Sequence, residues 1–153
     1  MIDILDRINL YEILNKIQAD DKPIFGMMTA QHMVEHLALV VRFSNGKLPQ
    51  INHFPGKEEK IKSFLLDTEK EIPIGLKLPV LPIDKLIALN YSDLIFAINI
   101  LKLELSDFDT YFANNPTALP IHPATGELTY KEWLIFHNNH FRHHFKQFGL
   151  LPH

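Results

Sequence analysis

The chain contains no cysteine, and this absence excludes disulfide bonds, thiolate metal ligands and a cysteine nucleophile. It also lacks any run of the roughly 20 apolar residues that would cross a bilayer. Residues 1–10 carry acidic side chains where a signal peptide has a basic region followed by an apolar run. Because the lack of cysteine also suits a reducing compartment, these features predict a cytoplasmic protein that does not enter a membrane.

Clustered positive charge is missing as well. Lys and Arg together number 15 against 18 Asp and Glu, and the formal net charge is −3 at pH 7. The charges are spread along the chain and form no basic patch that would neutralise phosphate groups. We therefore expect no nucleic-acid partner.

What the sequence does contain is the composition of one globular domain spanning residues 1–153. Hydrophobic residues make up 46% and charged residues 22%, and this length is enough to bury a single core. Apolar residues recur with the 3.6-residue period of an amphipathic helix in four segments: 2–17, 29–43, 92–112 and 129–149. No strand is predicted, and we expect an all-α four-helix bundle.

A long connection separates the second predicted helix from the third. Residues 47–82 contain five prolines and one helix-compatible island at residues 58–71. A bundle in which neighbouring helices run parallel needs a crossover of this length. We interpret residues 47–82 as that crossover, serving either as a plain connector or as a lid.

The chain has nine histidines, four of which lie within residues 137–144. At about 100° per residue, His137, His140 and His144 share the apolar face of the last predicted helix. Buried imidazoles need partners, since an unpaired buried polar group costs about 1–3 kcal/mol, and a metal would satisfy several together. His140 and His144 are four residues apart and can aim at one point, whereas His137 lies about 10 Å of helical rise from His144.

The third ligand has to come from another helix. Residues 29–43 form a helix that is apolar on most sides, and it carries His32 and His36. The residues alone leave either histidine as the third ligand. For the histidines outside the cluster, a hydrogen-bonded structural role is the alternative interpretation, and it is the one we favour for His32, His53, His122 and His153.

His32, Glu35 and His36 also match the H-x-x-E-H pattern of one class of zinc protease. That chemistry needs the glutamate beside the metal, but Glu35 projects about 100° away from His36. We expect Glu35 to pair with Arg42 on a polar edge of the helix, and we interpret the protease-like pattern as coincidence.

Two motifs resemble the DinB-like superfamily of bacterial metal-binding four-helix bundles. Residues 29–37, T-A-Q-H-M-V-E-H-L, resemble the family's helix-opening motif, which ends in a ligand histidine. Residues 140–147, H-F-R-H-H-F-K-Q, match the family pattern H-x-x-H-H-x-x-[QH]. The segment 122–133, H-P-A-T-G-E-L-T-Y-K-E-W, and the ending Q-F-G at 147–149 are similar to one uncharacterised subfamily. The resemblance covers the second helix and the last third of the chain, while residues 47–82 match no family pattern.

The resemblance implies that His36, His140 and His144 are the ligands, with His32 and His143 as neighbours. It further implies a divalent metal, zinc or nickel, an up-down-down-up order of helices, and a homodimer. Characterised members of the family include thiol S-transferases that use low-molecular-weight thiols such as bacillithiol or mycothiol, together with isomerases and hydrolases.

Three imidazole ligands leave a coordination position open, as in catalytic zinc sites. We therefore expect a metal-dependent transferase or hydrolase acting on a small molecule, with Glu35 and His143 as the nearest candidates for a general base. A non-catalytic metal-binding or stress-response protein is the alternative. Beside the histidine face, Leu134, Phe141 and Phe145 form a second apolar stripe, which either packs against a neighbouring helix or forms a dimer contact.

Overall fold

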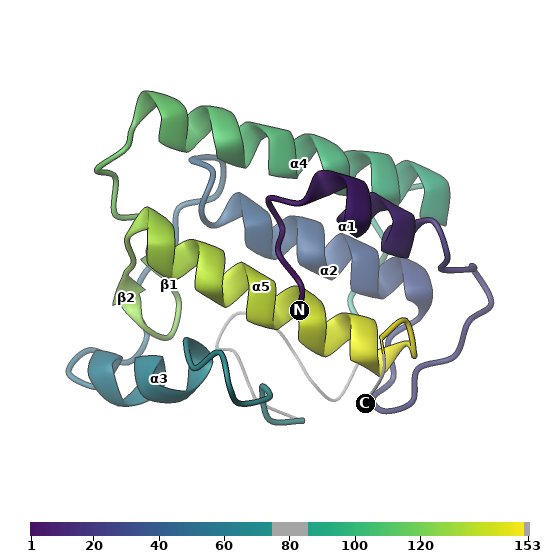
Figure 1. The fold of residues 1–153 in the computed structure, drawn as a ribbon, viewed down its shortest axis with the longest axis horizontal. Coiled ribbons are helices and arrows are strands. Elements are labelled where there is room, and N and C mark those ends of the chain that lie inside the picture. The colour runs from purple at the N-terminus through teal and green to yellow at the C-terminus, as the bar shows by residue number, and fades with distance from the viewer. Residues whose placement is uncertain (75–85, 152–153) are drawn as a thin grey trace.

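The computed structural model describes residues 1–74 and 86–151, and this part of the chain is mostly helical (Figure 1). It contains one small antiparallel sheet, formed by β1 (Ile121–His122) and β2 (Gly126–Glu127). The helices are α1 (Arg7–Leu14), α2 (Ala30–Arg42), α3 (Glu58–Leu65), α4 (Leu94–Asn114) and α5 (Tyr130–Gln147). The predicted helical class is confirmed in this coarse form. Within the described residues, no helix is both long and apolar enough to cross a membrane.

Side-chain caps mark the starts of α2, α4 and α5. The Thr29 hydroxyl accepts a hydrogen bond from the His32 amide at the start of α2, and Asp93 does the same for α4. At the start of α5, Thr129 and Glu132 form a capping box. Each cap satisfies a backbone N–H that has no partner inside the helix, so the beginnings of these helices were readable from the sequence.

The contribution of the Thr129 cap to the stability of α5 can be tested directly. Replacing Thr129 with alanine is expected to lower the free energy of unfolding by about 1 kcal/mol, because the Glu132 amide loses its acceptor. Urea unfolding followed by circular dichroism measures the change. Replacing the exposed Thr117, which lies outside the helices, serves as the matched control and should change stability by less than about 0.5 kcal/mol.

The N-terminal prediction is wrong, because the first helix begins at Arg7 and not at Ile2. Asp6 caps this shorter helix, and the Ile4 amide donates instead to Asn138 Oδ1 on α5 at 2.8 Å. Ile2 and Ile4 are buried although they precede the helix, whereas Ile8, inside the helix, is 79% exposed. The contact with α5 across the fold overrides a helical pattern that was only local.

The prediction that the chain has no strand is also wrong. His122 pairs with Gly126 in a hairpin of two residues a side, and the Ala124 amide donates to His122 Nδ1 at 3.0 Å to close the turn. Gly126 has a φ of +74°, and a Cβ there would lie 3.1 Å from Asn52 Nδ2. Strands of two residues are too short to show an alternating pattern in the sequence.

One apolar core joins α1, α2, α4 and α5, and α2 lies between α4 and α5 and packs against both (Figure 1). Phe141 and Phe145 are fully buried in this core. Of the two interpretations of the second apolar stripe, packing inside the molecule is therefore confirmed for these two residues, since buried rings cannot form a dimer contact.

Within the described part of the predicted crossover, residues 47–74, the segment 65–70 is hydrogen-bonded to α5. Its helix, α3, ends at Leu65, six residues before the end of the predicted island. Beyond it, Asn139 donates to the carbonyls of Leu65 and Asp67, and Arg142 donates to those of Thr68 and Lys70. Residues 65–70 therefore run along one side of α5. The rest of the predicted crossover, and with it part of the predicted lid, lies outside the described residues from position 75 on.

Candidate metal centre

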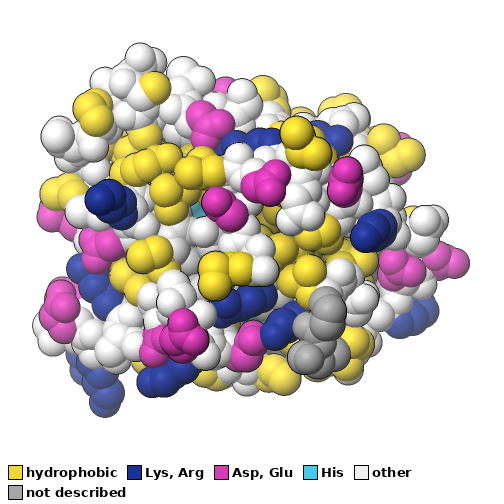
Figure 2. Space-filling view, in the orientation of Figure 1, with side chains coloured by type: hydrophobic (Ala, Val, Ile, Leu, Met, Phe, Trp, Pro, Cys, Tyr) yellow, Lys and Arg dark blue, Asp and Glu magenta, His cyan; other side chains and the backbone are white. Residues whose placement is uncertain are grey.

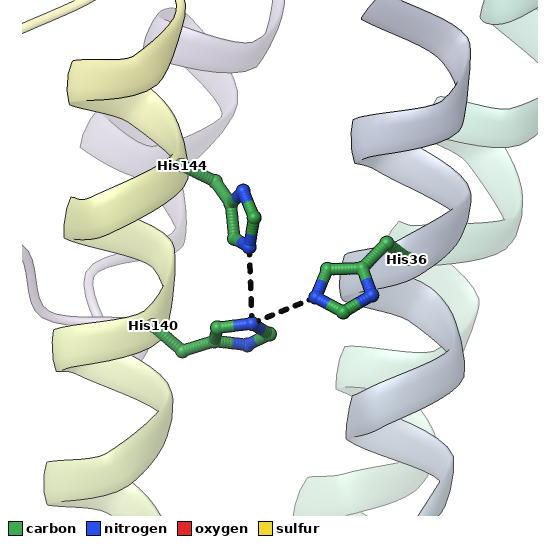
Figure 3. A group of neighbouring side chains, drawn as sticks. All are labelled: His36, His140 and His144. Carbon is green, nitrogen blue, oxygen red and sulfur yellow. Dashed lines mark hydrogen bonds between the residues drawn. The ribbon is translucent and has the colours of Figure 1, made fainter. Parts of the chain in front are cut away.

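Two helices bring three histidines together in the middle of the fold. His140 and His144 lie one turn apart on α5, and His36 projects toward them from α2 (Figure 3). The Thr29 cap and the Thr129 capping box fix where these helices begin. The structure therefore selects His36, and not His32, as the histidine that meets the pair on α5.

The three rings turn their Nε2 atoms toward one another. His140 Nε2 lies 2.9 Å from His36 Nε2 and 3.2 Å from His144 Nε2 (Figure 3). The ring centroids are 4.7–4.8 Å apart, and each pair of rings meets edge to face. One ring nitrogen from each residue can be chosen so that all three lie within 4.8 Å of one another.

These distances fit a shared metal ion. Zn–N bonds are about 2.0–2.1 Å long, so two imidazoles bound to one ion place their nitrogens roughly 3.0–3.4 Å apart. Hydrogen bonds alone do not satisfy all three rings, because one proton on His140 Nε2 cannot point well at both His36 Nε2 and His144 Nε2. The three histidines could therefore hold a metal ion.

Burial keeps the three imidazoles neutral, which is the form that binds a metal. His140 and His144 are 5% and 6% exposed, and histidine reaches the surface shown in Figure 2 in only one small area. Desolvation, with a smaller contribution from His143, lowers the pKa of His36 to about 4. Desolvation also moves the pKa values of His140 and His144 well below 6.5. Protons therefore compete little with a metal near neutral pH.

Gln147, the last residue of the motif at residues 140–147, has a contact with the site that the sequence did not predict. Its Oε1 lies 2.7 Å from His144 Nδ1, on the side of the ring away from the site, and its side chain is buried. The signal in the sequence was the three-residue spacing between His144 and Gln147, which places both on one face of α5.

Most of the remaining histidines lie away from the site and have structural partners. The His32 ring lies 2.6 Å from Thr29 Oγ1 and 2.9 Å from the Ile87 carbonyl, which holds it at the start of α2. His137 Nε2 lies 2.8 Å from Ser44 Oγ in the core, and His122 closes the hairpin. The structural interpretation is thus confirmed for His32 and His122. His153 lies outside the described residues.

His143 lies next to the site. Its ring centroid is 4.9 Å from that of His144 and 5.3 Å from that of Phe25. Desolvation lowers its pKa, although the charge of Glu71 acts in the opposite direction. Its candidate role as a base stays a prediction.

The Glu35 carboxylate makes hydrogen bonds away from the three histidines. Its carboxylate accepts hydrogen bonds from the amide of Asn90 at 2.7 Å and from Gln31 Nε2 at 2.9 Å, so it anchors the segment that leads into α4. The predicted pair with Arg42 is wrong, because Arg42 lies 3.6 Å from Glu104. With both His32 and Glu35 bound to other groups, the H-x-x-E-H pattern does not assemble the protease arrangement.

In comparisons with known proteins, no family model matches the chain, and no curated protein or solved structure matches it. The metal centre therefore rests on the geometry of the three histidines, and the resemblance to the DinB-like superfamily rests on the sequence motifs.

Proposed function

We propose that this chain is a divalent-metal-binding protein of the DinB-like superfamily. In this proposal α1, α2, α4 and α5 are the four helices of the bundle, in up-down-down-up order, and residues 47–82 form the crossover. The placement of the motif histidines His36, His140 and His144 around one point supports it. A homodimer belongs to the same proposal.

The observation that carries the proposal is the convergence of three Nε2 atoms at 2.9 and 3.2 Å. Three neutral imidazoles suit zinc or nickel, which accept nitrogen ligands readily. A site with three protein ligands leaves room for a further ligand, as catalytic zinc sites do. His36, His140 and His144 would hold the ion.

The reaction that we propose is transfer or hydrolysis on a small molecule, of the thiol S-transferase or hydrolase type. The ion would act as a Lewis acid that lowers the pKa of a water molecule or of a low-molecular-weight thiol such as bacillithiol or mycothiol. His143 is the better placed of the two candidate bases, because its ring lies beside that of His144. Glu35 already accepts hydrogen bonds from Gln31 and Asn90.

Elemental analysis of protein purified without chelator tests the metal, and a panel of thiols and electrophiles then tests the reaction. We expect one zinc or nickel ion per chain and turnover that is lost on replacing His144 with alanine. Protein without stoichiometric metal, before and after incubation with zinc and nickel, overturns the whole proposal. Stoichiometric metal without turnover of any compound overturns the enzymatic part and favours the alternative, a non-catalytic metal-binding protein.

A further inference from the structure

Two successive hydrogen bonds connect His144 to the loop before α2 through the side chain of Gln147. Gln147 Oε1 lies 2.7 Å from His144 Nδ1, and Gln147 Nε2 donates to the carbonyl of Phe25 at 3.0 Å. The Gln147 side chain is only 4% exposed, so water does not compete freely for these contacts. The amide of Gln147 thus lies between a backbone carbonyl and a candidate metal ligand.

The Phe25 carbonyl determines which group donates in each of these two hydrogen bonds. A carbonyl oxygen can only accept a hydrogen bond, so Phe25 requires the NH₂ group of Gln147. The amide oxygen then faces His144 Nδ1, and a hydrogen bond forms there only if Nδ1 carries the proton. In a neutral imidazole the lone pair is then on Nε2, the atom that lies 3.2 Å from His140 Nε2.

The loop that supplies the carbonyl is shaped around Gln147. Gly26 has a φ of +78°, and a Cβ there would lie 3.0 Å from Gln147 Nε2. The Ile24 amide donates to the Gln147 carbonyl at 2.7 Å, so the loop holds both the backbone and the side chain of this residue. Any residue other than glycine at position 26 would be strained and would push the amide away from Phe25.

We propose that Gln147 is a positioning residue: polarised by the Phe25 carbonyl, it holds His144 in the tautomer whose Nε2 lone pair faces the centre of the site. The consequence for metal binding rests on the proposed function, but the tautomer itself is a property of the metal-free protein. Groups that orient a ligand histidine in this way are typically worth 10- to 100-fold in metal affinity.

Nitrogen-15 NMR of the metal-free protein tests the tautomer directly. Long-range proton–nitrogen correlation distinguishes a protonated from an unprotonated ring nitrogen, and the His144 signals are identified by their loss in His144→Ala. We expect His144 to carry its proton on Nδ1 in the wild type and to populate both tautomers in Gln147→Met, which keeps the length of the side chain but has no amide. A wild-type His144 protonated on Nε2 overturns the proposal.

Zinc titration of the same proteins separates positioning from packing. We expect Gln147→Met and Gly26→Ala to raise the Kd for zinc by about 10- to 100-fold. Gln147→Glu should stay within a few-fold of the wild type, because a carboxylate still accepts from Nδ1–H although it loses the bond to Phe25. A Gln147→Glu variant that loses as much affinity as Gln147→Met contradicts the proposal, since only a structural role would make the two equal.

Gln31→Met is the matched control. Gln31 Nε2 also makes two hydrogen bonds, to Glu35 and to the Tyr91 carbonyl, but it makes no hydrogen bond to the three site histidines. Its Kd for zinc should remain within a few-fold of the wild type, and a loss as large as that of Gln147→Met contradicts the proposal. If the wild type binds no zinc while His144 is protonated on Nδ1, the proposed function fails and the positioning role of Gln147 stands.

Discussion

Replacing His140 with alanine is expected to weaken metal binding severely. Its Nε2 is the central atom of the trio, at 2.9 Å from His36 and 3.2 Å from His144, so its loss leaves two ligands on separate helices. Structural zinc sites with four ligands bind with about 10–16 kcal/mol, or roughly 2.5–4 kcal/mol per ligand. Isothermal titration with zinc should therefore show a Kd raised by on the order of 10²- to 10³-fold.

Two controls make this result specific to the site. His53→Ala removes an exposed histidine from the loop before α3 and should leave the Kd for zinc unchanged. His32→Ala removes the other histidine of α2, whose ring contacts Thr29 and Ile87, and should affect stability more than zinc binding. Equal losses of affinity in His32→Ala and His140→Ala would contradict the assignment of His36 as the third ligand.

Acid is expected to unfold the metal-free protein as the pH falls from about 6.5 toward 3. His122 and His137 are 1% and 0% exposed, and desolvation lowers the pKa of each to about 3. In the unfolded chain both protonate near pH 6.5, so below that pH the unfolded state binds more protons and is favoured. The stabilisation is complete above pH 6.5 and is lost as the pH approaches 3.

The expected loss of folding stability at low pH follows from the lowered pKa values of His122 and His137. Each pKa unit corresponds to about 1.4 kcal/mol, so each of the two histidines contributes several kcal/mol across this range. Such a sum is comparable to the whole stability of a typical domain, about 5–15 kcal/mol. When no metal is bound, the lowered pKa values of His36, His140 and His144 also make the folded protein less stable as the pH falls.

Urea unfolding at a series of pH values, with chelator present, measures this dependence. Below pH 6.5 the free energy of unfolding should fall by about 1.4 kcal/mol per pH unit for each proton taken up on unfolding. His122→Gln should reduce that slope by about one proton. Ser44→Ala removes a contact of His137 but no titrating group, so it should lower stability without reducing the slope. Equal slopes in the wild type and His122→Gln would contradict the explanation.

Local physical signals were enough to predict three of the helices. Thr29, Asp93 and Thr129 each cap a helix whose apolar residues recur every 3.6 positions, and α2, α4 and α5 begin where these caps lie. The same periodicity failed at residues 2–17, because the burial of Ile2 and Ile4 is set by a contact with Asn138 on α5. A helical pattern in the sequence cannot reveal a hydrogen bond between residues more than 130 positions apart.

The sequence by itself determined which residues could form a metal site. The four-residue spacing of His140 and His144 places both on one face of a helix wherever that helix packs, because 3.6 residues per turn is a local property of the backbone. The absence of cysteine excluded thiolate ligands, and the spacing of His32 and His36 offered two candidates for the third position.

Only the tertiary structure decided between those candidates and supplied the residue behind the site. The angle at which α2 meets α5 turns His36 inward and leaves His32 with Thr29 and Ile87. The contact of Gln147 with Phe25 depends on a loop more than 120 residues away in the chain. Such relations between elements follow from how their faces pack, whereas the pattern along one helix fixes only which residues share a face.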